Sequence, residues 1–268
     1  MRRTLPAALA TLVVLASVAL LSSPAPLSAG AAPTSEPRPS AAAARWTWHT
    51  VYKDDFSGTT VSPAWSPYHG PYGSDPKNFA REDHFYLNGR GQLVLLMKYR
   101  RSGDDGAAWY TGGAMLQAQY GGRFQTIDIR YKVVSRGVRS YRNIPLRWVD
   151  DPLYKWYQGE TNFNEGSSLD RVVTFLHYDL DGQVWKSYRV DMTKWHTWRF
   201  VHRPDRKVRV YLDGKLLWSY QGTRRTVPDA FRRVVLQQEV PVRNPPKSTK
   251  GSDRILIDYM RIRTSSKG

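Results

Sequence analysis

Three polar side chains, Glu160, Asn162 and Glu165, lie within six residues of one another in the stretch 159–166. Successive side chains of a β-strand point to opposite faces, so Glu160 and Asn162 would share one face, with Asn164 next on it. A β-bulge adds one residue to a strand and would bring Glu165 onto that face instead. Two carboxyls on one concave face suit cleavage of a glycosidic bond. One attacks the anomeric carbon and the other protonates the leaving oxygen, at a separation of about 5–5.5 Å in retaining enzymes.

On a flat strand the Cα atoms of Glu160 and Glu165 would lie roughly 16 Å apart. A bulge, strand curvature and two long side chains leaning inward therefore have to close the gap. The alternative is an exposed acidic strand or loop without chemistry, because short motifs also match by chance. Trp148 and Trp156 flank the stretch and are candidate platforms for sugar rings, although core packing is the more common role of a single tryptophan.

The elements that would position these residues are all expected to be strands. From residue 46 onward, short apolar runs are separated by turn residues, and no long stretch repeats at helical period. This pattern predicts an all-β fold, a two-sheet antiparallel β-sandwich of jelly-roll type. The predicted strands cover residues 51–56, 85–87, 92–99, 125–134, 171–178, 195–202, 207–212, 234–240 and 255–262. Asn88-Gly89 and Asp213-Gly214 predict hairpin turns.

The first 44 residues are not expected to join this fold. Residues 1–31 combine two arginines, an apolar core and a small-residue cleavage site, which predicts a secretory signal peptide. Residues 32–44 are rich in Pro, Ala and Ser and predict a linker, and residues 45–268 form the predicted catalytic domain. No later apolar stretch approaches the about 20 residues of a membrane span, so the protein is predicted to be secreted.

Composition excludes several classes of site. The chain has no cysteine and its six histidines lack metal-binding spacing, so no disulfide or zinc site is expected. The formal net charge is +17. The basic residues are dispersed rather than clustered in runs, so we predict a basic surface suited to anionic surroundings and no dedicated nucleic-acid groove.

The order of these landmarks resembles glycoside hydrolase family 16, the laminarinase/agarase-like enzymes on a concanavalin A-like β-jelly roll. The segment 159–165 matches the family motif Glu-x-Asp-x-x-Glu, with Asn162 in place of the middle Asp. Five other regions resemble family segments in the family's order and extend the likeness over nearly all of 46–263. They are 110–113, 120–124, 174–178, 196–198 with 211–214, and 257–262.

The resemblance implies roles for individual residues. Glu160 would be the nucleophile, Glu165 the general acid/base, and Asn162 the residue that orients the nucleophile. His177 would line the cleft and touch the sugar or Glu165, with a buried strand histidine as the alternative. Trp109 is a weaker candidate for substrate binding.

The same resemblance bears on cofactors. The double-displacement chemistry requires none. Family members often carry a structural calcium on the convex side, for which Asp54, Asp55 and Asp258 could supply oxygen ligands. Salt bridges from these carboxylates to the many arginines are the alternative.

Replacement of the middle Asp removes a negative charge that would help keep Glu165 protonated. We therefore expect a lower pKa for Glu165, with a lower pH optimum or weaker turnover. The predicted function is a secreted, monomeric retaining endo-glycosidase that acts on internal β-linkages of a polysaccharide: a β-glucan, a β-galactan or an anionic glycan. A lectin-like binding protein that has lost turnover is the alternative, and transglycosylation stays open.

Overall fold

The computed structural model describes residues 46–71, 78–101, 106–241 and 245–267. The predicted signal peptide at 1–31 and linker at 32–44 lie outside these residues. Within the described ranges, no helix is long and apolar enough to cross a membrane.

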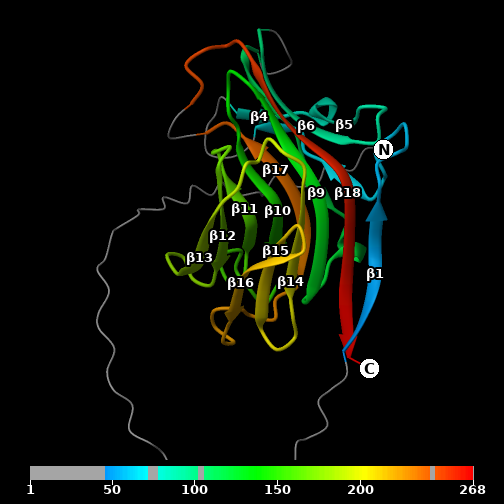
Figure 1. Ribbon diagram of the computed structural model, residues 1–268, viewed down its shortest axis with the longest axis vertical. Coiled ribbons are helices and arrows are strands. Elements are labelled where there is room, and N and C mark those ends of the chain that lie inside the picture. Colours follow the sequence, from blue (N-terminus) through cyan, green and yellow to red (C-terminus); the bar gives the residue numbers. More distant parts are fainter. Residues whose placement is uncertain (1–45, 72–77, 102–105, 242–244, 268) are drawn as a thin grey trace, which may run out of the picture.

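Two β-sheets make up the fold (Figure 1). The larger sheet contains eleven strands: β1 (Trp46–Asp54), β3 (Gly70–Pro71), β4 (Asn78–Ala80), β5 (Phe85–Leu87), β6 (Leu93–Arg100), β7 (Ala108–Thr111), β9 (Gln125–Arg136), β14 (His196–His202), β15 (Lys207–Leu212), β16 (Lys215–Gln221) and β18 (Ser252–Lys267). The smaller contains seven: β2 (Trp65–Pro67), β8 (Gly113–Leu116), β10 (Tyr141–Val149), β11 (Thr161–Gly166), β12 (Arg171–His177), β13 (Gln183–Arg189) and β17 (Arg232–Glu239). Two 3₁₀ helices, η1 (Glu82–His84) and η2 (Ala118–Tyr120), complete the described elements.

The order of strands places residues from distant parts of the sequence side by side. The larger sheet runs β16-β15-β14-β9-β18-β6-β7-β4-β3, with β1 also paired to β18 and β5 to β6. The smaller runs β13-β12-β11-β10-β17-β8-β2. Among the described strand pairs, β4 with β7 is parallel and the rest are antiparallel. The predicted antiparallel sandwich and both predicted hairpins, β5 with β6 and β15 with β16, are confirmed.

Strand β10, at the centre of the smaller sheet, was not predicted. Its sequence contains Pro145, which lacks an N–H and is normally excluded from central strands. The pairing of β10 with β17 shifts register between Asn143 and Leu146, so the proline occupies an irregularity in the ladder. A proline at such a position costs the sheet little, which explains why the local pattern was misleading.

The core lies between the two sheets. Side chains that alternate along each strand interdigitate there, and Phe163 of β11 stacks on Phe200 of β14 with ring centroids 4.3 Å apart. Burial of such side chains contributes about 1.5–3 kcal/mol each. Because Phe163 of β11 is anchored in this core, its neighbour Asn162 is held on the opposite, outward face of the smaller sheet.

Candidate active site

Strand β11 carries the bulge that the sequence predicted. Asn162 pairs with Phe175 and Glu165 with Val173, so three steps along β11 match two along β12. The side chain of Asn164 is directed into the sandwich, where its Nδ2 donates to the hydroxyl of Tyr131 at 2.8 Å. Glu165 is therefore on the side of Asn162, as the catalytic motif requires.

Asn162 joins the two carboxyls. Its Nδ2 donates to Oε2 of Glu165 at 2.8 Å, and a hydrogen bond from the same side chain lowers the pKa of Glu160. The hydroxyl of Tyr141, on β10, donates to the other oxygen of Glu165. All three motif residues are buried, so the alternative of an exposed acidic loop does not apply.

Burial dominates the electrostatics of this pair. Desolvation, with smaller contributions from the negative charges of Glu165 and Glu239, raises the pKa of Glu160 to about 8 against the hydrogen bond from Asn162. Desolvation also raises the pKa of Glu165, opposed by the hydrogen bonds from Tyr141 and Asn162. Burial, which the sequence does not reveal, therefore holds the pKa of Glu165 above its ordinary value. The expected decrease of this pKa relative to a site with Asp at position 162 stays a prediction.

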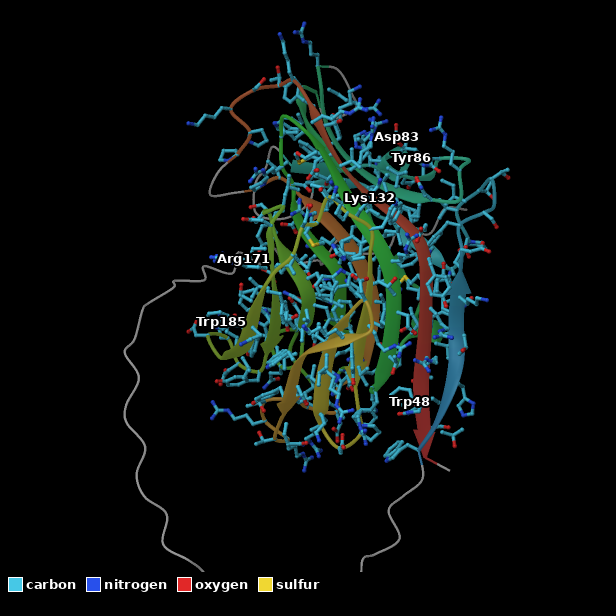
Figure 2. The ribbon with its side chains drawn as sticks, in the orientation of Figure 1. Trp48, Asp83, Tyr86, Lys132, Arg171 and Trp185 are labelled. Carbon is cyan, nitrogen blue, oxygen red and sulfur yellow. The ribbon has the colours of Figure 1, made fainter. Side chains whose placement is uncertain are left out.

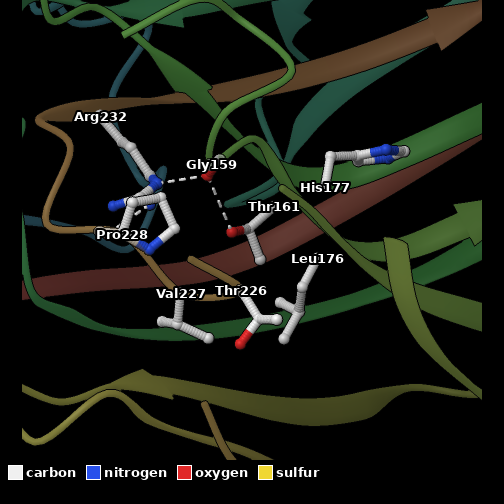
Figure 3. Close-up of a pocket in the computed structure, with 8 residues that line it drawn as sticks. All are labelled: Gly159, Thr161, Leu176, His177, Thr226, Val227, Pro228 and Arg232. Atoms are coloured by element: carbon white, nitrogen blue, oxygen red, sulfur yellow. Dashed lines mark hydrogen bonds between the residues drawn. The ribbon is translucent and has the colours of Figure 1, made fainter. Parts of the chain in front are cut away.

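Glu160 is positioned by its neighbour Gly159. This glycine has φ +128°, and a Cβ there would lie 2.6 Å from Nη2 of Arg232, so no other residue fits without strain. Nε of the buried Arg232 donates to the carbonyl of Gly159, and its Nη2 donates to the carbonyl of Pro228 at 2.9 Å (Figure 3). The backbone immediately before Glu160 is thus tied to the loop that precedes β17.

A small pocket borders this anchor, lined by Gly159, Thr161, Leu176, His177, Thr226, Val227, Pro228 and Arg232 (Figure 3). Leu176 and Val227 belong to the core between the sheets. The pocket therefore lies on the inward side of β11, whereas Glu160 and Asn162 are on the outward side, and we do not assign substrate to it.

His177 lies with the motif residues, as the resemblance implied. Its Nε2 is 3.4 Å from Nδ2 of Asn162, and its backbone N–H donates to the carbonyl of Glu160 at 2.9 Å. Burial lowers the pKa of His177 to about 4, so the ring is neutral near pH 7. A neutral ring can accept the amide hydrogen but adds no positive charge to the site.

The predicted tryptophans separate into two groups. Trp148 shares a face with Leu146, which pairs directly with Asn162. The ring of Trp148 stacks on that of Trp156, with ring centroids 6.4 Å apart. Both rings thus belong to the surroundings of the motif. Trp109 is not brought to this face: it is buried in the larger sheet in a cluster with Met97.

Trp185 was missed by the sequence analysis. Asn162 pairs with Phe175, and Phe175 pairs with Trp185 on the edge strand β13, so the three side chains share one face across three strands. The side chain of Trp185 is 53% exposed and lies at the margin of the molecule (Figure 2). No local signal separates this tryptophan from the other nine.

Glu239 was also missed. It ends β17 and pairs directly with Tyr141, the residue that hydrogen-bonds Glu165. Nε2 of Gln237 donates to its carboxylate. Glu239 therefore adds a third carboxylate to the surroundings of Glu160. Its negative charge, from β17, partly replaces the charge that an Asp at position 162 would supply.

The carboxylates considered for calcium have other partners. Asp258 forms an ion pair with Arg130. Asp54 accepts hydrogen bonds from the Tyr52 hydroxyl and the Phe56 amide. In the part of the chain that the structure describes, no group of three or more His, Asp or Glu side chains could hold a metal ion. Asp258 forms the salt bridge to an arginine that was the alternative to calcium binding.

Comparison with known proteins establishes the fold. No protein-family model and no curated protein matches the sequence. The laminarinase from Rhodothermus marinus matches with a TM-score of 0.69 and 18% identity, covering 82% of this chain and 99% of that one. The endo-β-1,3-glucanase from Pyrococcus furiosus matches with a TM-score of 0.66 and 17% identity, covering 82% and 96%.

A non-specific endo-β-1,3(4)-glucanase of glycoside hydrolase family 16 matches with a TM-score of 0.66 and 16% identity, covering 82% of this chain and 92% of that one. The chain is thus similar in structure to endo-glucanases of this family. The predicted resemblance is confirmed at the level of the fold.

Proposed function

We propose that the protein is a secreted retaining endo-glycosidase that hydrolyses internal linkages of an uncharged β-glucan. The observation that carries the proposal is the pair of buried carboxyls, Glu160 and Glu165, joined by the amide of Asn162 across a bulge. The structural neighbours are glucanases, which supports a β-glucan. An anionic glycan is disfavoured because Glu239 adds a third carboxylate beside Glu160.

The reaction follows from the two carboxyls. Ionised Glu160 attacks the anomeric carbon, and Glu165 gives its proton to the leaving glycosidic oxygen as that bond breaks. Glu165, now ionised, then takes a proton from water, whose oxygen displaces Glu160 from the sugar. The competent enzyme therefore holds one proton on the pair, located on Glu165.

In the free protein the shared proton favours the other carboxyl. Glu165 accepts two hydrogen bonds, whereas Oε2 of Glu160 is buried without a partner among the described residues. Bound sugar therefore has to shift the proton from Glu160 to Glu165, for example through a sugar hydroxyl that donates a hydrogen bond to Glu160. This requirement is the specific reason to retain a second candidate, a lectin that binds the glycan and does not cleave it.

The test is to incubate the purified protein with laminarin, mixed-linkage β-glucan, agarose and an anionic β-glycan between about pH 4 and 9, measuring reducing ends. We expect cleavage of a neutral β-glucan, and loss of at least about 10³-fold in kcat with Glu160→Gln or Glu165→Gln. Separation of the products distinguishes hydrolysis from transfer to a second sugar. Binding of a glycan without cleavage at any pH, unchanged in Glu160→Gln, would establish the lectin instead.

The pH profile is predicted to be bell-shaped and displaced upward. Activity falls at low pH as both carboxyls become protonated, and at high pH as both lose their proton. Since burial raises both pKa values, with Glu160 at about 8, the alkaline limb is expected near pH 8. Stopped assays across this range check it, and a profile centred below pH 5 would contradict it.

Asn162→Asp tests the departure from the family motif. The new carboxylate repels charge on Glu160 and Glu165 and removes the amide that donates to Glu165, so both pKa values rise. The alkaline limb is expected to move up by about one pH unit. Asn162→Ala also removes the donor but adds no charge, and serves as the matched control with a smaller movement.

Trp185→Ala is expected to weaken substrate binding. A sugar chain that extends from Glu160 across β12 would reach the exposed indole on β13, whose flat face suits the C–H face of a pyranose. We expect KM to rise about fivefold to tenfold, with little change in kcat, for long substrates only. Leu180→Ala, another exposed apolar residue, is the control; an equal effect in both variants would remove Trp185 from the site.

A further inference from the structure

The outward face of the larger sheet carries a row of charged residues that the proposed chemistry does not use. Arg199 on β14 pairs directly with Asp128 on β9, and Asp128 pairs with Arg261 on β18. Arg261 in turn pairs with Lys53 on β1. Directly opposed residues share a face, and the residues on either side of Asp128 are in the core, so the row points away from the core. Figure 1 shows β9, β18 and β1 running along the same side of the molecule.

Three guanidinium groups converge on the one carboxylate in this row. Arg199 donates to Oδ1 of Asp128, Arg261 donates to Oδ2 at 2.9 Å, and Nη2 of Arg263 is 3.4 Å from Oδ2. The Asp128 side chain is 4% exposed, but those of Arg199, Arg261 and Arg263 are 49%, 33% and 29% exposed. A single carboxylate neutralises one of three positive charges, and most of the N–H groups of the arginines stay available.

Further cations surround this cluster. Arg209 on β15 and Arg263 on β18 lie in the next row, which crosses β14 at Val201 and β9 at Thr126. Arg130 and Lys132 continue the same face of β9, with their charged groups 4.8 and 5.0 Å from the ring centre of Trp195. Within the described residues, Lys132 and Arg209 have no ion-pair partner.

We define the basic face as this set of residues with its two carboxylates: Lys53, Arg130, Lys132, Arg199, Arg209, Arg261 and Arg263, with Asp128 and Asp258. Neighbouring strands are about 4.8 Å apart and alternate residues about 6.7 Å apart. From β15 to β1 the basic face therefore spans roughly 20 Å. Such a width suits a chain of repeated anionic groups rather than a single small anion.

We propose that the basic face binds a polyanionic polysaccharide and holds the protein on an anionic matrix. The candidate active site on the other sheet is lined by Glu160, Glu165 and Glu239, so the same polymer would not be favoured there. Single-stranded nucleic acid is the less suitable partner because it requires exposed aromatic rings for stacking. The rings on this face, Trp195, Tyr211 and Tyr259, are only partly exposed, and Trp195 already contacts Arg130 and Lys132. The inference does not depend on the proposed hydrolysis.

The test measures binding of the purified protein to dextran sulfate at low and high salt, with uncharged dextran as the blank. A triple variant replaces Lys53, Lys132 and Arg209 by glutamine, which leaves the three arginines on Asp128 intact. We expect at least a tenfold loss of affinity at low salt, and a weaker dependence of the remaining binding on salt. An unchanged melting temperature shows that the variant is folded.

The matched control removes the same charge elsewhere. Arg171, Lys186 and Arg189 are exposed on β12 and β13, apart from the basic face (compare Arg171 with Lys132 in Figure 2). Their replacement by glutamine is expected to change affinity less than about threefold, because distant exposed charges are screened. Equal losses in both triple variants would overturn the proposal, since net charge alone would then explain binding. Tighter binding of single-stranded DNA than of dextran sulfate would overturn it in favour of nucleic acid.

Discussion

Glu160→Gln is expected to make the protein more stable while it removes catalysis, with a stability gain that grows with pH. Burial raises the pKa of Glu160 from 4.5 to about 8, so the folded protein holds this proton more tightly than the unfolded chain. The folded state is therefore not destabilised by Glu160 below pH 4.5. Its free energy of unfolding decreases as the pH rises from 4.5, and the full loss is reached above about pH 8. Glutamine carries no charge and escapes that cost.

The expected difference between Glu160→Gln and the natural protein is near zero at pH 4 and about 5 kcal/mol at pH 8.5, because each pKa unit corresponds to about 1.4 kcal/mol. Urea unfolding followed by tryptophan fluorescence at several pH values measures it. Glu82→Gln, at an exposed position of η1, is the control and should leave the free energy of unfolding unchanged at every pH. A difference for Glu160→Gln that does not grow with pH would mean that this carboxyl is not desolvated in the folded protein.

This opposition between stability and activity is expected of a catalytic carboxyl. A structural glutamate gains hydrogen bonds or an ion pair on burial, whereas Oε2 of Glu160 has neither among the described residues. Asp253 provides the contrast: it is equally enclosed, but Ser140 and Arg142 donate to its Oδ2. The Asp253 carboxylate is thus stabilised by a serine and a guanidinium, whereas the nearest charged groups acting on Glu160 are the carboxylates of Glu165 and Glu239.

Much of the fold could be predicted because its signals are local. The turn at Asp213-Gly214 and the alternating strand β9 can each be predicted from their local sequence alone. The bulge in β11 was predicted because a motif with its second carboxyl five residues after the first is compatible with one face only if a residue is added. Strand β10 was missed because its proline is tolerated through a register shift with β17, which no local pattern reveals.

The catalytic residues were predictable because they lie on one segment, and His177 because of the resemblance. Glu160, Asn162 and Glu165 occur together in the sequence, and the structure keeps them together. Tyr141 and Glu239 come from strands that pair with one another but are far apart in the chain. Their position beside the motif therefore depends on the topology of the sheet. The rise in the pKa of Glu165 could not be predicted for the same reason, because burial is a property of the whole fold.

Arg232 is a further residue that sequence patterns did not identify, and its substitution is expected to have the largest effect on folding. It is 1% exposed, and its guanidinium donates to the carbonyls of Gly159, Pro228 and Ala230, the last at 2.7 Å. Burial lowers the pKa of Arg232 to about 10, so it stays charged near pH 7. The planar fork of donors is what allows one cation to serve three carbonyls.

Arg232→Lys keeps the charge but not the fork, and leaves buried carbonyls without donors. We expect the free energy of unfolding to fall by about 3–5 kcal/mol, measured by urea unfolding. Arg233→Lys is the matched control: the neighbouring side chain is partly exposed, donates to the carbonyl of Leu116 at 2.9 Å and pairs with the exposed Asp150. The loss in the free energy of unfolding should be below about 1 kcal/mol.

The hydrogen bond from Arg232 to Gly159 should also affect catalysis, since Gly159 directly precedes Glu160. In any fraction of Arg232→Lys that folds, the carbonyl of Gly159 is released, so Glu160 loses its fixed approach to the anomeric carbon. We expect kcat to fall at least about tenfold with KM within about twofold. Gly159→Ala should reproduce this split, because its Cβ would collide with the guanidinium. If both variants were less stable but kept the natural kcat at a temperature where they are folded, Arg232 would stabilise the sandwich without positioning Glu160.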